Sequence, residues 1–164
     1  MDTPSFSVAQ LETLRGFFRV MNHFMVFMWK MGFGKMINCW PPGFGRIMII
    51  KNKGRKTGKE RLTPVNYAIV DQQIYCTAGF GSGSDWYRNI LAQPQVELWL
   101  PDGKHQAYVE DISDSPDRIA LLREVITASG FAGPLFGVNP KQCSDEKLAA
   151  ITKDYRLLNF KQEF

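Results

Sequence analysis

Cysteine and histidine are scarce in this chain of 164 residues. Its three cysteines, Cys39, Cys76 and Cys143, are widely spaced and form no Cys-x-x-Cys pair. The sequence therefore predicts neither a disulfide framework nor a structural zinc site, and it favours a reducing, cytoplasmic environment. The two histidines, His23 and His105, are too few for a histidine-rich centre, so we expect no metal.

The pattern of a transmembrane helix is also missing, and so is that of a signal peptide. Between Arg19 and Lys30 the N-terminal segment has ten uncharged residues, about half of the ~20 that a spanning helix needs. Residues 1–10 contain no basic stretch leading into an apolar core. The sequence shows no Ser-His-Asp arrangement, paired-carboxylate site or Walker loop, so none of these designs is expected.

What is present indicates a globular chain with a single domain over residues 1–164. Hydrophobic residues make up 45% of the chain, charged residues 22% and aromatic residues 13%, which is ordinary for a protein with a real core. We divide the domain into an N-terminal helix and connector (1–45), a central barrel region (46–112) and C-terminal helices with a last strand (113–164). A break at Pro41-Pro42-Gly43 lies near the end of the first part.

The first predicted element is an amphipathic helix over residues 8–31. Apolar side chains recur at spacings of three and four residues: Leu11, Leu14, Phe18, Met21, Met25 and Met28. Arg15, Arg19 and His23 share the opposite stripe, while further aromatic residues widen the apolar face. Such a helix packs on its own domain or on a dimer mate, or it lies on a membrane surface with its aromatic side chains inserted.

From residue 46 onward the pattern is that of strands joined by hairpins. Strands are expected at 46–51, 61–70, 73–78, 95–100, 104–112 and 155–161, with Asp71-Gln72 as one hairpin turn. Helices are expected at 86–92, from Ser115-Pro116-Asp117 to about Ala128, and after Ser144. No crossover helix separates the strands between residues 46 and 78, which disfavours a parallel sheet. The sequence therefore predicts a small antiparallel barrel with peripheral helices.

Positive charge is concentrated in residues 51–61, which we call the basic turn. It holds six Lys or Arg residues and one Glu, a local charge of +5, whereas the whole chain carries +4. Two glycines bracket Arg55, Lys56 and Thr57, a pattern that suits a tight turn offering N–H groups, a hydroxyl and two cations to an anion. Three interpretations stay open: a phosphate clamp, a solvated hairpin tip, or a nucleic-acid patch. The slightly acidic remainder of the chain disfavours the last.

A second segment points to the same kind of ligand. Residues 79–83, Gly-Phe-Gly-Ser-Gly, form a glycine loop that leads into the predicted helix at 86–92. The N-terminus of a helix attracts anions through its free N–H groups and its dipole. Trp86 and Tyr87 offer an aromatic wall for a flat ring, and Arg88 a further cation. The alternative is that Trp86 is a core residue that plugs one end of the barrel.

Together these motifs resemble the deazaflavin-dependent nitroreductase family, within the flavin/deazaflavin oxidoreductase superfamily. The resemblance rests on Gly54-Arg-Lys-Thr-Gly-Lys59, Arg61-Leu-Thr-Pro64, and Asp85-Trp-Tyr-Arg-Asn-Ile-Leu-Ala92 with Pro94 and Val96. It runs from about residue 24 to residue 112. It implies a split antiparallel β-barrel, FMN-binding-like in fold, that uses the deazaflavin coenzyme F420 and pairs as a homodimer.

The resemblance also implies roles at the matching positions. The coenzyme's phosphate and acidic tail are expected at Arg55, Lys56 and Thr57. The ribityl chain and ring are expected above Arg61, Thr63, Pro64, Val65 and Asn66. Backbone N–H groups of Thr77, Ala78, Gly79, Phe80 and Gly81 contact the ring or phosphate, and the site is completed by Trp86, Tyr87, Arg88 and Asn89.

Two positions depart from the family pattern. Relatives often have Ser-Lys-Gly-Gly where this chain has Gly79-Phe-Gly-Ser82, which removes one cation for the tail and leaves FMN as the alternative cofactor. Asn66 stands where some members have an aromatic residue facing the substrate. Other branches of the superfamily resemble binders of FMN, haem-derived pigments or fatty acids, and some are membrane-associated.

The resemblance implies an oxidoreductase that transfers a hydride from the reduced deazaflavin to an electron-poor small molecule, as nitroreductases and quinone or enone reductases do. No catalytic residue is assigned; Tyr67, Tyr75, Tyr87 or water are the possible proton donors. One rival is a non-catalytic binder of a flavin, a tetrapyrrole pigment or a fatty acid. Another is a module whose N-terminal helix contacts the inner membrane face peripherally. We expect no nucleic-acid partner.

Overall fold

A computed structural model describes residues 8–38, 45–130 and 139–162 of the chain. The described residues form six strands that close into one antiparallel barrel in the order β1-β2-β3-β6-β5-β4. Their bounds are β1 Ile47–Lys53, β2 Glu60–Val70, β3 Gln73–Ala78, β4 Gln95–Leu100, β5 Gly103–Asp111 and β6 Arg156–Gln162. The predicted antiparallel barrel is confirmed. The predicted break at Pro41-Pro42-Gly43 lies outside the described residues.

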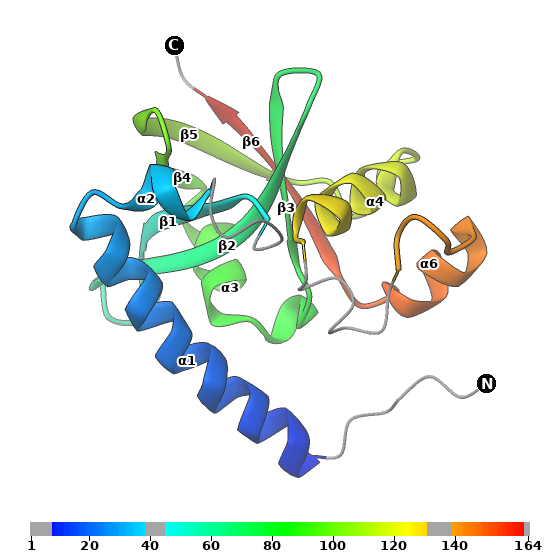
Figure 1. Cartoon of the computed structure of the whole chain (residues 1–164), viewed down its shortest axis with the longest axis horizontal. Coiled ribbons are helices and arrows are strands. Elements are labelled where there is room, and N and C mark those ends of the chain that lie inside the picture. The colour runs from blue at the N-terminus through cyan, green and yellow to red at the C-terminus, as the bar shows by residue number, and fades with distance from the viewer. Residues whose placement is uncertain (1–7, 39–44, 131–138, 163–164) are drawn as a thin grey trace.

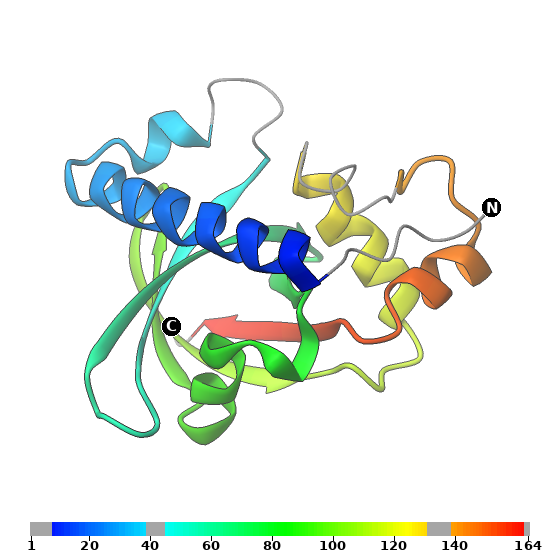
Figure 2. The same ribbon diagram turned by 90° about the horizontal axis from the view of Figure 1, so that it is seen from below.

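Helices surround this barrel (Figure 1). They are α1 Val8–Lys30, α2 Gly34–Ile37, the short 3-10 helix η1 Gly81–Gly83, α3 Asp85–Ala92, α4 Arg118–Ala128 and α6 Asp145–Ile151. Figure 2 shows α1 running across the barrel, with α3 on the other side of the first half of β2. Of these elements, α2 and η1 were absent from the sequence-based expectation.

Strand alternation fills the barrel with apolar side chains. In β3, Ile74, Cys76 and Ala78 are buried while the residues between them are half-buried, as expected when successive side chains point to opposite faces. Val96, Leu98 and Leu100 do the same in β4. Full burial raises the pKa of the Cys76 thiol, which agrees with its prediction as a small core hydrophobe.

The apolar stripe predicted for α1 holds this helix on the barrel. Met25 is buried with Ile37 of α2 and Ile47 of β1, and Met21 and Met28 pack against the same cluster. Of the aromatic residues that widen the stripe, Trp29 also packs against this cluster, whereas Phe24 and Phe27 are 56% and 57% exposed. No helix within the described ranges is long and apolar enough to cross a membrane.

Local backbone geometry and capping define three further boundaries between helices, strands and turns. Asp71 and Gln72 both have positive φ values, 48° and 64°, which is the geometry of a two-residue hairpin turn. The hydroxyl of Ser144 accepts a hydrogen bond from the Lys147 N–H and so caps α6 as predicted. Helix α4 begins two residues later than Pro116, with Asp117 at the N-cap position.

Candidate functional site

The split of the barrel lies along one edge of β2. Residues Glu60–Asn66 of β2 pair with β1, but β3 pairs only with Tyr67–Val70. Among the described strands, residues 60–66 therefore have a partner on one side only. Backbone groups of an unpaired strand edge are available to a ligand.

A cavity of about 840 Å³ lies beside this part of β2 and is called the β2 cavity below. Its volume falls in the range of small-molecule sites, roughly 300–1,000 Å³. It is lined by Asn22, His23 and Val26 of α1, by residues 60–64 of β2, and by Phe80, Gly83, Ser84, Asp85 and Trp86. Three segments that are distant in sequence thus form its walls.

The basic turn is attached to the helix that follows the glycine loop. The N–H of Arg55 donates to Oδ1 of Asn89 at 3.1 Å, and Nη1 of Arg55 donates to the same oxygen at 2.9 Å. Nη2 of Arg55 forms an ion pair with Asp85 at 3.1 Å. The two segments that the sequence singled out therefore lie in contact.

Within the basic turn, the backbone closes on itself. The N–H of Gly54 donates to the Lys59 carbonyl at 2.8 Å, and the N–H of Gly58 donates to the Gly54 carbonyl at 2.8 Å. Lys56, Thr57 and Lys59 are exposed at the tip. These side chains, unlike that of Arg55, have no ion pair with an acid within the described residues.

Arg61 joins the basic turn to the cavity. It lines the β2 cavity, and its Nε lies 3.7 Å from the point that a Cβ on Gly54 would occupy. The acid of this region, Glu60, is paired with Lys51 at 2.9 Å. That hydrogen bond lowers the pKa of Glu60, so its carboxylate is ionised but matched by a neighbouring cation.

The glycine loop requires glycine at one position. Gly81 has φ +56°, and a Cβ there would lie 2.2 Å from the carbonyl oxygen of Asp154. Only glycine allows this close approach of the loop to the segment before β6. Arg88 donates from Nε to the Ser82 carbonyl at 2.6 Å, so this predicted cofactor cation is held by the loop.

Tyr87 points away from the β2 cavity into a partly buried polar link. Its hydroxyl donates to Asp111, which also accepts from the N–H of Ser113 at 2.9 Å. The hydroxyl of Ser113 in turn accepts from the Leu157 N–H at 3.0 Å, so α3, β5 and β6 are connected. Burial and the hydrogen bond to Asp111 raise the pKa of Tyr87 to about 12.

The remaining predicted residues frame the site. Ala78 belongs to the barrel core, and Val65 and Trp86 pack against that core while staying partly exposed. Asn66 donates to the Arg46 carbonyl at 3.2 Å, and the Thr77 hydroxyl donates to the Arg156 carbonyl at 3.0 Å.

Gly79 lies against Tyr155. The predicted cofactor residues that line the β2 cavity are Arg61, Thr63, Pro64, Phe80 and Trp86.

Sequence reasoning missed the contribution of α1 to this cavity. Asn22, His23 and Val26 line it, although His23 had been assigned only to the polar stripe of the helix. Of the tyrosines considered as proton donors, Tyr67 is buried in the core and Tyr75 packs against the α4 cluster. Burial raises the pKa of Tyr67, which keeps its hydroxyl protonated. In the described parts of the chain no cluster of His, Cys, Asp or Glu is suited to a metal ion.

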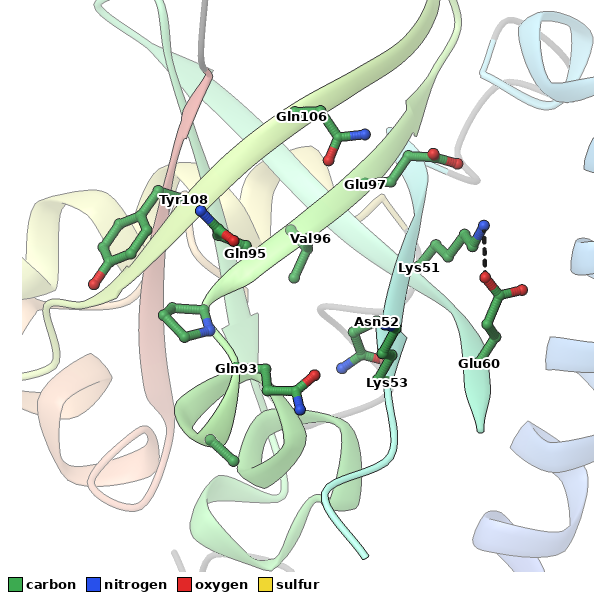
Figure 3. A pocket seen from close by; sticks show the side chains of 12 residues that line it. Lys51, Asn52, Lys53, Glu60, Gln93, Gln95, Val96, Glu97, Gln106 and Tyr108 are labelled. Carbon is green, nitrogen blue, oxygen red and sulfur yellow. Dashed lines mark ion pairs between the residues drawn. The ribbon is translucent and has the colours of Figure 1, made fainter. Parts of the chain in front are cut away.

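A second hollow, of about 640 Å³, opens where the end of β1 diverges from the start of β4. Figure 3 shows its lining, which is mostly polar: Lys51, Asn52 and Lys53 project from β1, and Gln95, Gln106 and Tyr108 come from β4 and β5. The Lys51–Glu60 ion pair stands at its rim. We call it the β1–β4 hollow; it offers no aromatic pair comparable to Phe80 and Trp86.

Solved structures share this fold at low sequence identity. A conserved hypothetical protein from Mycobacterium tuberculosis aligns with a TM-score of 0.53 and 16% identity over 73% of this chain and 74% of that one. An F420-H2 dependent reductase, FDR-A, aligns with a TM-score of 0.51 and 16% identity over 70% of this chain and 93% of that one. A further F420 reductase has a TM-score of 0.50 and 20% identity over 72% and 86%.

A family profile matches the amino-acid sequence of this chain. No curated protein matches the chain significantly. The profile of the F420H(2)-dependent quinone reductases, however, matches residues 27–131, a stretch that contains the basic turn, the glycine loop and all of β2. This confirms the predicted deazaflavin-dependent oxidoreductase and its cofactor, coenzyme F420. The chain belongs to the F420H(2)-dependent quinone reductase family.

Proposed function

We propose that the chain reduces a quinone with reduced coenzyme F420, and that the coenzyme binds in the β2 cavity. The contact of Arg55 with Asn89 and Asp85 carries this proposal, because it sets the cations of the basic turn beside the aromatic wall of the cavity. A flat ring with a charged tail needs those two surfaces next to each other.

The residues present fit such a coenzyme. Trp86 and Phe80 offer faces for a flat ring, and Pro64 a further apolar surface. The unpaired edge of residues 60–66 offers backbone N–H and carbonyl groups to the polar edge of the ring. Arg61, with Lys56 and Lys59 beyond it, suits the phosphate and the acidic tail.

The coenzyme, when bound, supplies the hydride. The chain's own part is to hold the ring against β2, to keep its tail at the basic turn, and to place the acceptor. Other residues hold these segments in place: Arg55 and Asn89 fix the basic turn, and Gly81 and Arg88 fix the glycine loop.

We further propose peripheral contact of α1 and α2 with a membrane, where lipid-soluble quinones reside. The exposed apolar side chains of α1, α2 and the turn between them are Val20, Phe24, Phe27, Met31, Phe33 and Met36. Lys30 and Lys35 lie in the same two helices and suit an anionic surface. The homodimer and the cytoplasmic location stay predictions.

The test has two parts, a titration and a turnover assay. Coenzyme F420 and FMN are titrated side by side into the purified chain, and we expect F420 to bind more tightly. Reduced F420 is then mixed with menadione, a soluble quinone, and with a nitroaromatic compound. Faster oxidation with menadione supports the quinone assignment. F420 binding without quinone turnover would contradict it.

A further inference from the structure

We propose that Asn22 and His23 of α1 bind the oxygen atoms of the acceptor. This inference rests on the proposed function and adds to it a second binding surface, opposite the coenzyme. It concerns residues outside every motif by which the sequence pointed to the coenzyme.

The geometry of the cavity separates two walls. β2, the glycine loop and the start of α3 carry the groups suited to the coenzyme, and α1 supplies Asn22, His23 and Val26 to the same space. Residues 22, 23 and 26 share one face of a helix, because side chains three and four positions apart lie above one another. A ring resting on the β2 and Trp86 side has its other face toward these three residues.

The α1 wall is packed against β1. Met25, on the neighbouring stripe of the helix, is buried against Ile37 and Ile47. Asn38 locks that contact: its Nδ2 donates to the Ile47 carbonyl at 2.8 Å, and its Oδ1 accepts from the Ile47 N–H at 2.9 Å. A wall anchored in this way can position a ligand, because its side chains start from a rigid backbone.

The chemistry of the wall suits a quinone. We place the acceptor on the α1 side of the cavity, because hydride transfer needs the reacting atoms to approach within about 3–3.5 Å and the other wall is assigned to the coenzyme. Reduction adds one hydride, which carries two electrons, and one proton from water, and yields the hydroquinone. N–H donors of an amide and an imidazole stabilise the negative charge that develops on the quinone oxygen. Val26 provides the apolar contact for the ring.

Menadione is the probe for the experiment, since it has the quinone ring and no long tail. The variants are Asn22→Leu, His23→Leu and the double variant, and Phe24→Ala is the matched control. Phe24 lies on the same turn of α1 but is 56% exposed and outside the cavity lining. Its proposed contact with a membrane plays no part in an assay that contains no lipid. For each protein we measure the Kd of oxidised F420 by fluorescence, the KM and kcat for menadione, and the melting temperature.

We expect the double variant to lower kcat/KM for menadione by about tenfold, through a higher KM or a lower kcat. This is equivalent to the loss of one good hydrogen bond. The Kd of F420 and the melting temperature stay as in the parent, and Phe24→Ala changes none of these values. Asn22→Gln and His23→Asn, which keep N–H donors, restore part of kcat/KM.

Two results would overturn the inference and leave the quinone assignment standing. One is an unchanged kcat/KM in the double variant; the other is a raised Kd of F420, which would assign α1 to the coenzyme. A parent protein that binds F420 but does not reduce menadione overturns the proposed acceptor and this inference together.

Discussion

Asn89 of α3 accepts two hydrogen bonds from Arg55, one from its backbone N–H at 3.1 Å and one from Nη1 at 2.9 Å. The two residues are 34 positions apart, and Asn89 is buried. Arg55 is thereby engaged in holding the basic turn to α3. In our proposal, the cations left for the coenzyme's phosphate and tail are Lys56, Lys59 and Arg61.

Asn89→Ala tests this contact. It removes the oxygen that accepts from the Arg55 N–H and Nη1, while the ion pair of Nη2 with Asp85 remains. The expected loss in free energy of unfolding is about 1–3 kcal/mol. Because the turn loosens, the affinity for F420 falls as well. Chemical denaturation and a fluorescence titration measure the two effects. Full stability in the variant would show that the contact has no structural role.

Lys56→Ala with Lys59→Ala tests the exposed cations. In our proposal these two charges face the coenzyme's phosphate and tail, so their removal is expected to weaken F420 binding by about tenfold or more, and the loss shrinks as salt is added. Stability is unchanged, because both side chains are exposed. The matched control is Lys153→Ala, an exposed lysine at the end of α6. Equal affinities in the three proteins would remove the basic turn from the binding site.

Gly81→Ala and Gly83→Ala form a pair within one loop. At Gly81 a Cβ meets the Asp154 carbonyl at 2.2 Å and φ is +56°, whereas at Gly83 nothing lies within 4 Å. We expect Gly81→Ala to destabilise the fold by roughly 1–3 kcal/mol or more, and Gly83→Ala to have little effect. Thermal melts of the two variants decide the matter; similar melting temperatures would argue against this loop geometry.

The Tyr87–Asp111 hydrogen bond predicts a pH dependence of stability. The pKa of Tyr87 is about 12 in the folded chain and roughly 10 in an unfolded one. The contribution of protonated Tyr87 to the free energy of unfolding is therefore complete below about pH 10. It is lost as the pH rises from 10 towards 12.

Tyr87→Phe is the matched variant for this effect. It is expected to cost about 1–3 kcal/mol at neutral pH, since Asp111 loses a donor. The gap in free energy of unfolding between parent and variant then narrows as the pH rises from about 10 towards 12. Urea denaturation at several pH values measures it, and a constant gap would contradict the assignment.

The fold was largely predictable because hairpin patterns are local. The strand periods, the Asp71-Gln72 turn and the Met25 stripe of α1 follow from neighbours in the sequence, and the structure has each of them. Arg61, Pro64 and Trp86, which come from two of the family motifs, line one cavity in the structure; that they bind the coenzyme stays a prediction.

What could not be predicted depends on how distant segments meet. Trp86 and Tyr87 were both expected on the cavity wall, but consecutive helical residues point about 100° apart, so one faces the cavity and the other Asp111. The pairing of Arg55 with Asp85, and the position of His23 in the cavity wall, depend on contacts between residues 30 or more positions apart. No local pattern encodes such contacts.

The most direct measurement of the central claim is a crystal structure of the chain with coenzyme F420 bound. We expect the ring along Arg61–Pro64 of β2, beside Trp86, with the acidic tail at Lys56 and Lys59. A coenzyme seated instead in the β1–β4 hollow, away from Trp86, would contradict it.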